Sequence, residues 1–97
     1  MARLAGEQFA FEINVPGRYE VGRGAAAALR VDHTTVSRRH AALSLSEDRQ
    51  QLRVEDLGAA NGTRVNGATV KGTTHDLKDG DVLELGEVRL TVTFDRG

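Results

Sequence analysis

Apolar and polar residues alternate with a period of two along most of this chain, a pattern typical of strands that bury one face. The clearest run lies near the C-terminal end, where Val88, Leu90, Val92 and Phe94 fall on one face and Arg89, Thr91, Thr93 and Asp95 on the other. Residues 8–15 and 41–46 alternate in the same way. This period favours β-strands and leaves little room for helices.

Shorter apolar segments between these runs are separated by residues that favour turns. The segments are 19–21, 29–31, 52–55, 63–65, 69–70 and 82–85, and the turn pairs are Pro16-Gly17, Glu47-Asp48, Asn61-Gly62, Asn66-Gly67 and Asp79-Gly80. Asn-Gly and Asp-Gly pairs tolerate positive φ and suit tight hairpins. The sequence therefore predicts an all-β sandwich.

Two segments fall outside this pattern. Residues 25–30 are alanine-rich but too short for an independently stable helix, so a loop or a single turn is expected. Residues 1–7 have no long apolar run and no signal-peptide pattern. We expect them to be a disordered N-terminal segment, followed by a single domain over residues 8–95.

Length and composition limit the classes of function. Ninety-seven residues suffice for one domain of modest core. A formal net charge of −1 favours neither nucleic acid nor an anionic membrane as a partner. The absence of cysteine excludes disulfides and fits a reducing compartment, so the cytoplasm is the expected location. The Ala, Gly and Arg usage is compatible with a bacterial origin.

Three short polar motifs lie where the predicted strands are joined, and this places them on loops. They are Gly22-Arg23, Ser37-Arg38-Arg39-His40 and Asn61-Gly62-Thr63. Arginine offers a permanently charged fork of donors, serine a compact hydroxyl, and asparagine both a donor and an acceptor. Such groups suit the binding of an oxyanion without chemical reaction.

Together, the motifs and the strand pattern resemble a forkhead-associated (FHA) domain, a phosphothreonine-binding module. The resemblance extends from about Phe9 to Phe94. It includes Gly22-Arg23, 36–41 (VSRRHA), 56–58 (DLG), 61–63 (NGT), 65–67 (VNG), 77–81 (LKDGD) and 85–86 (LG). It implies a two-sheet β-sandwich of about eleven short strands, with the binding site on inter-strand loops at one end.

The resemblance also implies roles at the binding site. A phosphothreonine brings a charge of about −1.5 to −2 and three acceptor oxygens. Arg23 would clamp two of these oxygens, Ser37 would donate its hydroxyl, and Arg38 would add a main-chain amide and charge. Asn61 would hold the peptide main chain.

Further residues would support the site or select the peptide sequence. Gly22, His40, Gly62 and Thr63 are implied as supporting residues, with the His40 imidazole joining two loops. The loops around Thr34-Thr35 and from Arg64 to Asn66 would set the preference beyond the phosphothreonine. Arg64 would favour an acidic side chain, and Ala60 would line a notch for the threonine methyl group.

The chain departs from the family pattern at two places. Ala59 and Ala60 precede Asn61, where the family usually has a hydroxyl-bearing or otherwise polar residue. Losing one hydrogen bond to a charged group weakens binding by about 1.5–3 kcal/mol unless another group replaces it. Ala28-Leu29 stands where an Asp and an aliphatic residue are common, which affects loop rigidity more than the ligand.

Other functions have weaker support in the sequence. Residues 22–27 fit a dinucleotide fingerprint, but no amphipathic helix or βα alternation follows. Ser37, His40 and Asp32 lack the context of a hydrolase triad. His33, His40 and His75 have spacings that match no familiar zinc site. Arg38-Arg39 lacks the basic and aromatic neighbours of a nucleic-acid surface.

The function expected from these observations is phosphothreonine-dependent docking without catalysis, cofactor or metal. The partner would be a protein modified by an upstream serine/threonine kinase, and the module would be a monomeric domain of a longer protein. A phospho-independent scaffold that uses the same fold, with a weak or vestigial phosphate site, is the alternative. An enzyme is a third hypothesis, which the lack of an organised nucleophile or paired carboxylates disfavours.

Overall fold

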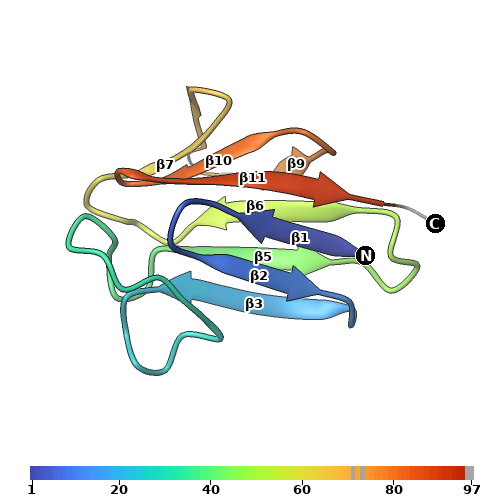
Figure 1. The fold of residues 1–97 in the computed structure, drawn as a ribbon, viewed down its shortest axis with the longest axis horizontal. Helices are drawn as coiled ribbons and strands as arrows, with labels where there is room; N and C mark the ends of the chain where they lie inside the picture. The colour runs from blue at the N-terminus through green and yellow to red at the C-terminus, as the bar shows by residue number, and fades with distance from the viewer. Residues whose placement is uncertain (71, 73, 96–97) are drawn as a thin grey trace.

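The computed structural model describes residues 1–70, 72 and 74–95, and it shows two β-sheets packed face to face (Figure 1). The six-stranded sheet has the order β2 (Ala10–Ile13), β1 (Ala2–Ala5), β11 (Val88–Phe94), β10 (Val82–Leu85), β7 (Thr63–Val65), β8 (Ala68–Thr69). The five-stranded sheet has the order β4 (Leu29–Arg30), β3 (Gly17–Gly22), β5 (Ala41–Leu45), β6 (Leu52–Asp56), β9 (His75–Leu77). The prediction of an all-β, two-sheet sandwich is confirmed.

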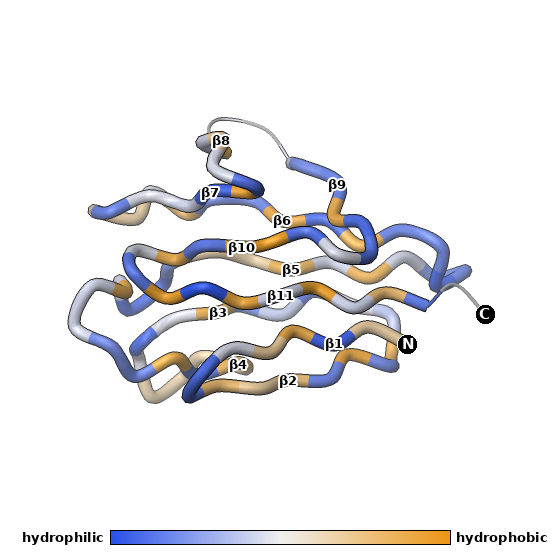
Figure 2. Tube along the Cα trace, turned by 45° about the horizontal axis from the view of Figure 1, so that its top comes forward, coloured by the Kyte–Doolittle hydropathy of each residue, from blue (hydrophilic) through white to orange (hydrophobic). Residues whose placement is uncertain are grey.

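The core lies between the two sheets and consists mainly of leucine and valine. Strand β11 follows the predicted alternation along its whole length, with Val88, Leu90, Val92 and Phe94 buried (Figure 2). It pairs with β10 on one side and with β1 on the other, which makes it a central strand of the six-stranded sheet. The buried side chains of β11 therefore face the opposite sheet, and the exposed side chains between them face outward.

The expectation of disorder over residues 1–7 was wrong for the segment 2–5. Strand β1 lies between β2 and β11 and forms antiparallel ladders with both. Its residues Ala2 and Leu4 are completely buried. The segment is only four residues long, which is too short for an alternating pattern to be recognised in the sequence. It is held as a strand because the backbone groups of both neighbouring strands form hydrogen bonds with it.

Two further differences concern strand ends. Strand β9 was not predicted, because only Leu77 of its three residues is apolar and buried. Val15 was expected on an inward face, but β2 ends at Ile13 and the side chain of Val15 is 64% exposed. Short strands at a sheet edge and strand ends give the weakest periodic signals.

Tight turns follow the predicted residue preferences. Asn66 and Gly67 join β7 to β8 with φ values of 51° and 84°, the positive pair that a type I′ hairpin requires. The alanine-rich segment forms a single turn closed by a hydrogen bond from Ala27 N to the Gly24 carbonyl at 3.1 Å. That expectation is confirmed.

The loops that follow β1, β3, β6 and β10 all lie at one end of the sandwich, whereas both chain termini lie at the other (Figure 1). The long connection from β3 through β4 to β5 forms most of that loop-bearing end. It brings the motifs around residues 22, 37 and 61 to the same end of the molecule. No helix able to cross a membrane occurs in the part of the chain that the structure describes.

Candidate functional site

Two loops from the five-stranded sheet lie against each other and form the floor of the site. The amide of Arg23 donates to the Ser37 carbonyl at 2.9 Å, and the amide of Gly24 donates to the Arg38 carbonyl at 3.1 Å. A Cβ atom on Gly22 would lie 2.0 Å from the Arg38 carbonyl oxygen, closer than any real side chain approaches. Glycine at position 22 therefore permits the contact between these loops.

Arg23 begins the loop after β3 and is held by only one of its donor groups. Its Nε donates to the Val36 carbonyl at 3.1 Å, and its own carbonyl accepts from Arg30 Nε at 3.1 Å. Among the described residues, neither terminal amino group of Arg23 has a hydrogen-bond or ion-pair partner. The side chain is therefore anchored near its base, and its outer fork is free for an anion.

Ser37 presents a hydroxyl group with a fixed position and an unused proton. Its Oγ accepts a hydrogen bond from the Ala60 amide at 3.1 Å, and its own amide donates to His40 Nδ1 at 3.0 Å. Within the described part of the chain, the hydroxyl donates to no protein acceptor. It can therefore donate to a ligand without breaking an existing contact.

The neighbouring residues Arg38 and Arg39 are in different electrostatic situations. Arg39 donates to both carboxylate oxygens of Glu20, at 2.8 and 2.9 Å. The hydrogen bonds from Arg39, and then those from Arg18, lower the pKa of Glu20 and keep it ionised. Arg38 is exposed, and its side chain forms no hydrogen bond or ion pair with the described residues. Only Arg38 of the pair therefore keeps an uncompensated charge near Ser37.

His40 joins the Ser37 loop to the Gly62 loop from a completely buried position. Its Nδ1 accepts from the Ser37 amide, so Nε2 carries the proton and donates to the Gly62 carbonyl at 2.7 Å. Both nitrogen atoms of the neutral ring are thereby used. His40 fixes the distance between the two loops that contain Ser37 and Asn61.

Asn61 links its own loop, after β6, to the loop before Ser37. Its Nδ2 donates to the Thr35 carbonyl at 2.9 Å, while its side chain remains exposed. The Thr35 hydroxyl in turn accepts from the Glu87 amide at 3.0 Å. One amide proton and the carbonyl oxygen of Asn61 remain available to pair with an extended peptide.

Asp56 is a supporting residue to which sequence reasoning assigned no role. One carboxylate oxygen accepts from the buried Thr63 hydroxyl at 2.7 Å, and the other accepts from the Gly58 amide at 3.0 Å. Gly62 lies within this loop at a φ of 75°. The order Asp56-Leu57-Gly58 before Asn61-Gly62-Thr63 contained the signal, because an aspartate at a strand end often caps the following turn.

The two alanines before Asn61 stabilise the loop through backbone hydrogen bonds alone. Ala60 contributes its amide to the Ser37 hydroxyl, and the Ala59 carbonyl accepts from the Gly62 amide at 3.2 Å. No side-chain hydroxyl is present at either position. At the other departure from the family pattern, Leu29 is buried in β4 beside Val21, so that position packs into the core.

The predicted specificity residues do not all lie together. Thr35, Asn61 and Arg64 share the lining of a hollow of about 250 Å³ at the loop-bearing end, and Ala60 lies in the adjoining hollow. Asn66 lies at the opposite end of β7. Its amide group donates to Asp81 at 2.9 Å and accepts from Val82 N at 2.8 Å. The structure therefore separates Asn66 from the other residues, and both ends of its amide hold the hairpin against β10.

The geometry bears on the other hypotheses as well. His40 contacts the Ser37 amide and not its hydroxyl, so the pair lacks the nucleophile–base hydrogen bond of a hydrolase. Residues 22–27 form a turn and no helix, so they lack the helix N-terminus of a dinucleotide site. No cluster of three or more metal-ligating side chains occurs in residues 1–70, 72 and 74–95.

Comparisons with known proteins place most of the chain in one family. The family model for the FHA domain matches residues 19–86. The FHA domain-containing protein FhaA of Mycobacterium tuberculosis is 43% identical over 72 residues, which are 74% of this chain and 13% of that protein. The vacuolar protein sorting-associated protein 64 of Saccharomyces cerevisiae is 38% identical over 55 residues. The chain thus spans only a small part of the curated relatives that it matches.

Solved structures match the chain over nearly its whole length. A domain studied for phosphothreonine-dependent FHA domain interactions is 34% identical, with a TM-score of 0.82 and coverage of 97% of this chain and 94% of that one. The FhaA FHA domain complexed with the intracellular domain of Rv3910 is 35% identical, with a TM-score of 0.79 and coverage of 94% and 96%. Together with the family match, these similarities show that the chain belongs to the FHA domain family.

Proposed function

We propose that this domain binds proteins phosphorylated on threonine and has no catalytic activity of its own. Arg23, Ser37 and Arg38 hold the phosphate group, and Asn61 pairs with the main chain of the bound peptide. The partner is a protein that an upstream serine/threonine kinase has phosphorylated on threonine. The phosphothreonine-dependent interactions of the 34%-identical structural relative support this assignment.

The observation on which the proposal depends is the pairing of Arg23 with Ser37. A backbone hydrogen bond of 2.9 Å holds the two residues together, while the outer donors of both side chains have no partner among the described residues. A dianionic phosphate needs convergent donors and positive charge, because hydrogen bonds between charged groups are the strongest available. The site provides these groups at the surface without further rearrangement.

Selectivity for threonine over serine is part of the proposal. Ala60 and Gly62 line a hollow together with Val70 beside Asn61. A methyl group placed in an apolar notch is worth about 1–3 kcal/mol. We therefore expect phosphothreonine peptides to bind more tightly than the matched phosphoserine peptides.

The proposal extends to the setting of the domain. A match to only 13% of the FhaA sequence supports a module within a longer protein. The mycobacterial relative supports a bacterial origin. We propose that the module acts in the cytoplasm, where an intracellular kinase would phosphorylate its partner. We further propose that the domain acts as a monomer and needs no cofactor, metal, nucleic acid or membrane.

The test is a titration of threonine-phosphorylated, serine-phosphorylated and unphosphorylated peptides from a degenerate library, followed by measurement of Kd for the best sequences. The Arg23→Ala variant removes the free guanidinium fork and is expected to weaken binding about 10- to 150-fold, since charged hydrogen bonds contribute about 1.5–3 kcal/mol. Arg39→Ala is the matched control, because Arg39 is neutralised by Glu20. Its affinity is expected to stay within about threefold of wild type.

The results separate docking from the alternatives. Binding that requires both phosphate and Arg23 supports the proposal. Equal affinity for phosphorylated and plain peptides would contradict it and favour the phospho-independent scaffold. Release of phosphate from the bound peptides during the titration would instead indicate an enzyme.

A further inference from the structure

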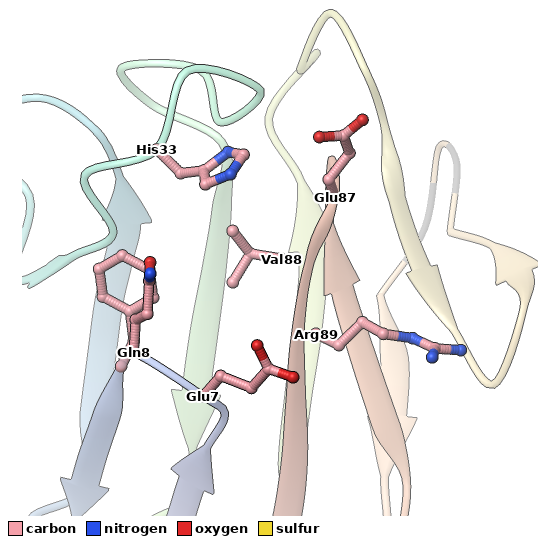
Figure 3. Close-up of a pocket in the computed structure, with 7 residues that line it drawn as sticks. Glu7, Gln8, His33, Glu87, Val88 and Arg89 are labelled. Carbon is pink, nitrogen blue, oxygen red and sulfur yellow. The ribbon is translucent and has the colours of Figure 1, made fainter.

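A second cleft lies beside the proposed phosphothreonine site, on loops to which the proposed function assigns no role. It has a volume of about 280 Å³ and lies between the turn after β1, the loop before Ser37 and the start of β11 (Figure 3). Its lining residues are Glu7, Gln8, Phe9, His33, Glu87, Val88 and Arg89. None of the residues predicted from sequence as ligand contacts belongs to this cleft.

The cleft adjoins one of the two hollows around Asn61. The hollow lined by Thr35, Asn61 and Arg64 also includes Glu87, which lines the new cleft. The Thr35 hydroxyl contacts both His33 Nδ1 at 2.8 Å and the Glu87 amide at 3.0 Å. A peptide that lies across Asn61 can therefore extend directly into the cleft.

The chemistry of the cleft combines an apolar floor with negative charge at its ends. Val88 is nearly buried and points into the space, and Phe9 packs against the hydrophobic core. Glu7 and Glu87 stand at opposite ends of the cleft (Figure 3). Both carboxylates are exposed and have no ion-pair or hydrogen-bond partner in the described part of the chain.

Among the described residues, no neighbouring cation forms an ion pair with either of these two carboxylates. The Arg89 head group points away from the cleft (Figure 3). Its Nε lies 3.6 Å from Glu84, the residue opposite it on the neighbouring strand β10. Arg64 is also associated with Glu84, at 3.8 Å. His33 accepts from the Thr35 amide through Nδ1 at 3.2 Å, so in the neutral ring its proton resides on Nε2.

The walls of the cleft are held in place before any ligand binds. Gly6 N donates to the Phe9 carbonyl at 2.8 Å and closes the turn that contains Glu7. A Cβ atom on Gly6 would lie 2.3 Å from the Arg89 carbonyl oxygen, which shows how closely this turn approaches β11. The positions of Glu7 and Val88 are thus coupled by direct backbone contact.

From this geometry we infer that the cleft binds a lysine or arginine side chain of the phosphorylated partner. The aliphatic stem of such a residue covers Phe9 and Val88, while its charged end lies near Glu7 or Glu87. The inference rests on the proposed function, because the phosphothreonine places the peptide across Asn61. It predicts a partner segment with phosphothreonine and a basic residue at a fixed spacing.

The experiment is a lysine scan on both sides of the phosphothreonine in a peptide that binds the domain, with glutamine at each position as the reference. At one position, lysine is expected to lower Kd about two- to fivefold relative to glutamine, the range that one exposed ion pair supplies. The Glu7→Gln/Glu87→Gln variant is expected to lose this preference. Neither substitution removes the backbone contacts of these residues.

Two controls make the result specific to the cleft. The Glu12→Gln/Glu47→Gln variant removes the same charge from exposed positions outside the cleft and is expected to keep the lysine preference. The Glu7→Lys/Glu87→Lys variant is expected to reverse it, so that a glutamate peptide binds better than a lysine peptide. Reversal cannot arise from partial unfolding, because unfolding weakens all peptides alike.

The failure of this inference differs from the failure of the proposed function. If phosphopeptides bind in an Arg23-dependent way and no position prefers lysine, only the cleft assignment is overturned. A preference that survives in Glu7→Gln/Glu87→Gln also overturns it. If the folded domain binds no phosphopeptide, both proposals fall together.

Discussion

At the scale of a single residue, His40 links two loops of the site, because each of its ring nitrogens forms a hydrogen bond with the backbone of a different loop. Replacing this completely buried side chain with alanine leaves the Ser37 amide without its acceptor and the Gly62 carbonyl without its shortest hydrogen bond. We expect His40→Ala to lower the free energy of unfolding by about 2–4 kcal/mol, since each unsatisfied buried group costs about 1–3 kcal/mol.

The measurement is urea unfolding of His40→Ala beside His75→Ala, whose side chain is exposed on β9. The control is expected to change stability by less than about 0.5 kcal/mol. A similar small change in His40→Ala would show that the two hydrogen bonds do not hold the loops together.

At the scale of an element, the N-terminal strand β1 provides the sharpest test of the fold. Leu4 is completely buried between the sheets, and its neighbour Arg3 is exposed on the outer face. Leu4→Ala is expected to lower the free energy of unfolding by about 2–5 kcal/mol through lost burial and a new cavity. Arg3→Ala is expected to change it by less than about 0.5 kcal/mol.

Both variants can be compared by thermal and urea denaturation. A disordered segment would respond equally weakly to the two substitutions. A large difference between neighbouring residues would therefore show that β1 is part of the sandwich in solution.

At the scale of the whole molecule, two surface carboxylates determine part of the response to acid. Hydrogen bonds from Arg39, and then from Arg18, lower the pKa of Glu20. The Ser46 hydroxyl, and then the Gln50 amide, lower the pKa of Asp48. Because the folded-state pKa is the lower one, their stabilising contribution is present above their ordinary pKa values and is lost as pH falls through the folded values.

We therefore expect stability to decrease as pH falls below about 4.5, with a shallower decrease in the Glu20→Gln/Asp48→Asn variant. Urea unfolding at a series of pH values from neutral to strongly acidic measures both slopes. The Glu12→Gln/Glu47→Gln variant removes two exposed carboxylates that have no described partners and serves as the control. Identical slopes in the first variant and wild type would exclude a role for these hydrogen bonds.

The elements that were predictable are those whose pattern is long or chemically specific. Strand β11 has seven alternating residues, and the Asn66-Gly67 pair has the two positive φ values that its composition favours. Strands β1 and β9 were missed, because four or three residues provide too few periods to distinguish a strand from a loop. Their place in the sheets comes from pairing with neighbours that are distant in sequence.

The same division applies to the site residues. Arg23, Ser37 and Asn61 were recognisable as anion-binding or peptide-binding residue types on loops, and the structure places those loops at one end of the sandwich. Asn66 was grouped with them because it is near in sequence. A strand is extended, however, and rises about 3.3 Å per residue. The three residues of β7 are therefore enough to carry Asn66 away from that end.

The amino-acid sequence alone determined the all-β class, the hairpin turns and the kinds of donor at the candidate phosphate site, because these depend on local periodicity and side-chain chemistry. Only the tertiary structure decided which donors remain free, as the contrast between Arg38 and the neutralised Arg39 shows. It also formed the cleft between Glu7 and Glu87, which are distant in sequence. Contacts of that kind depend on strand pairing across the whole chain, and no local pattern records them.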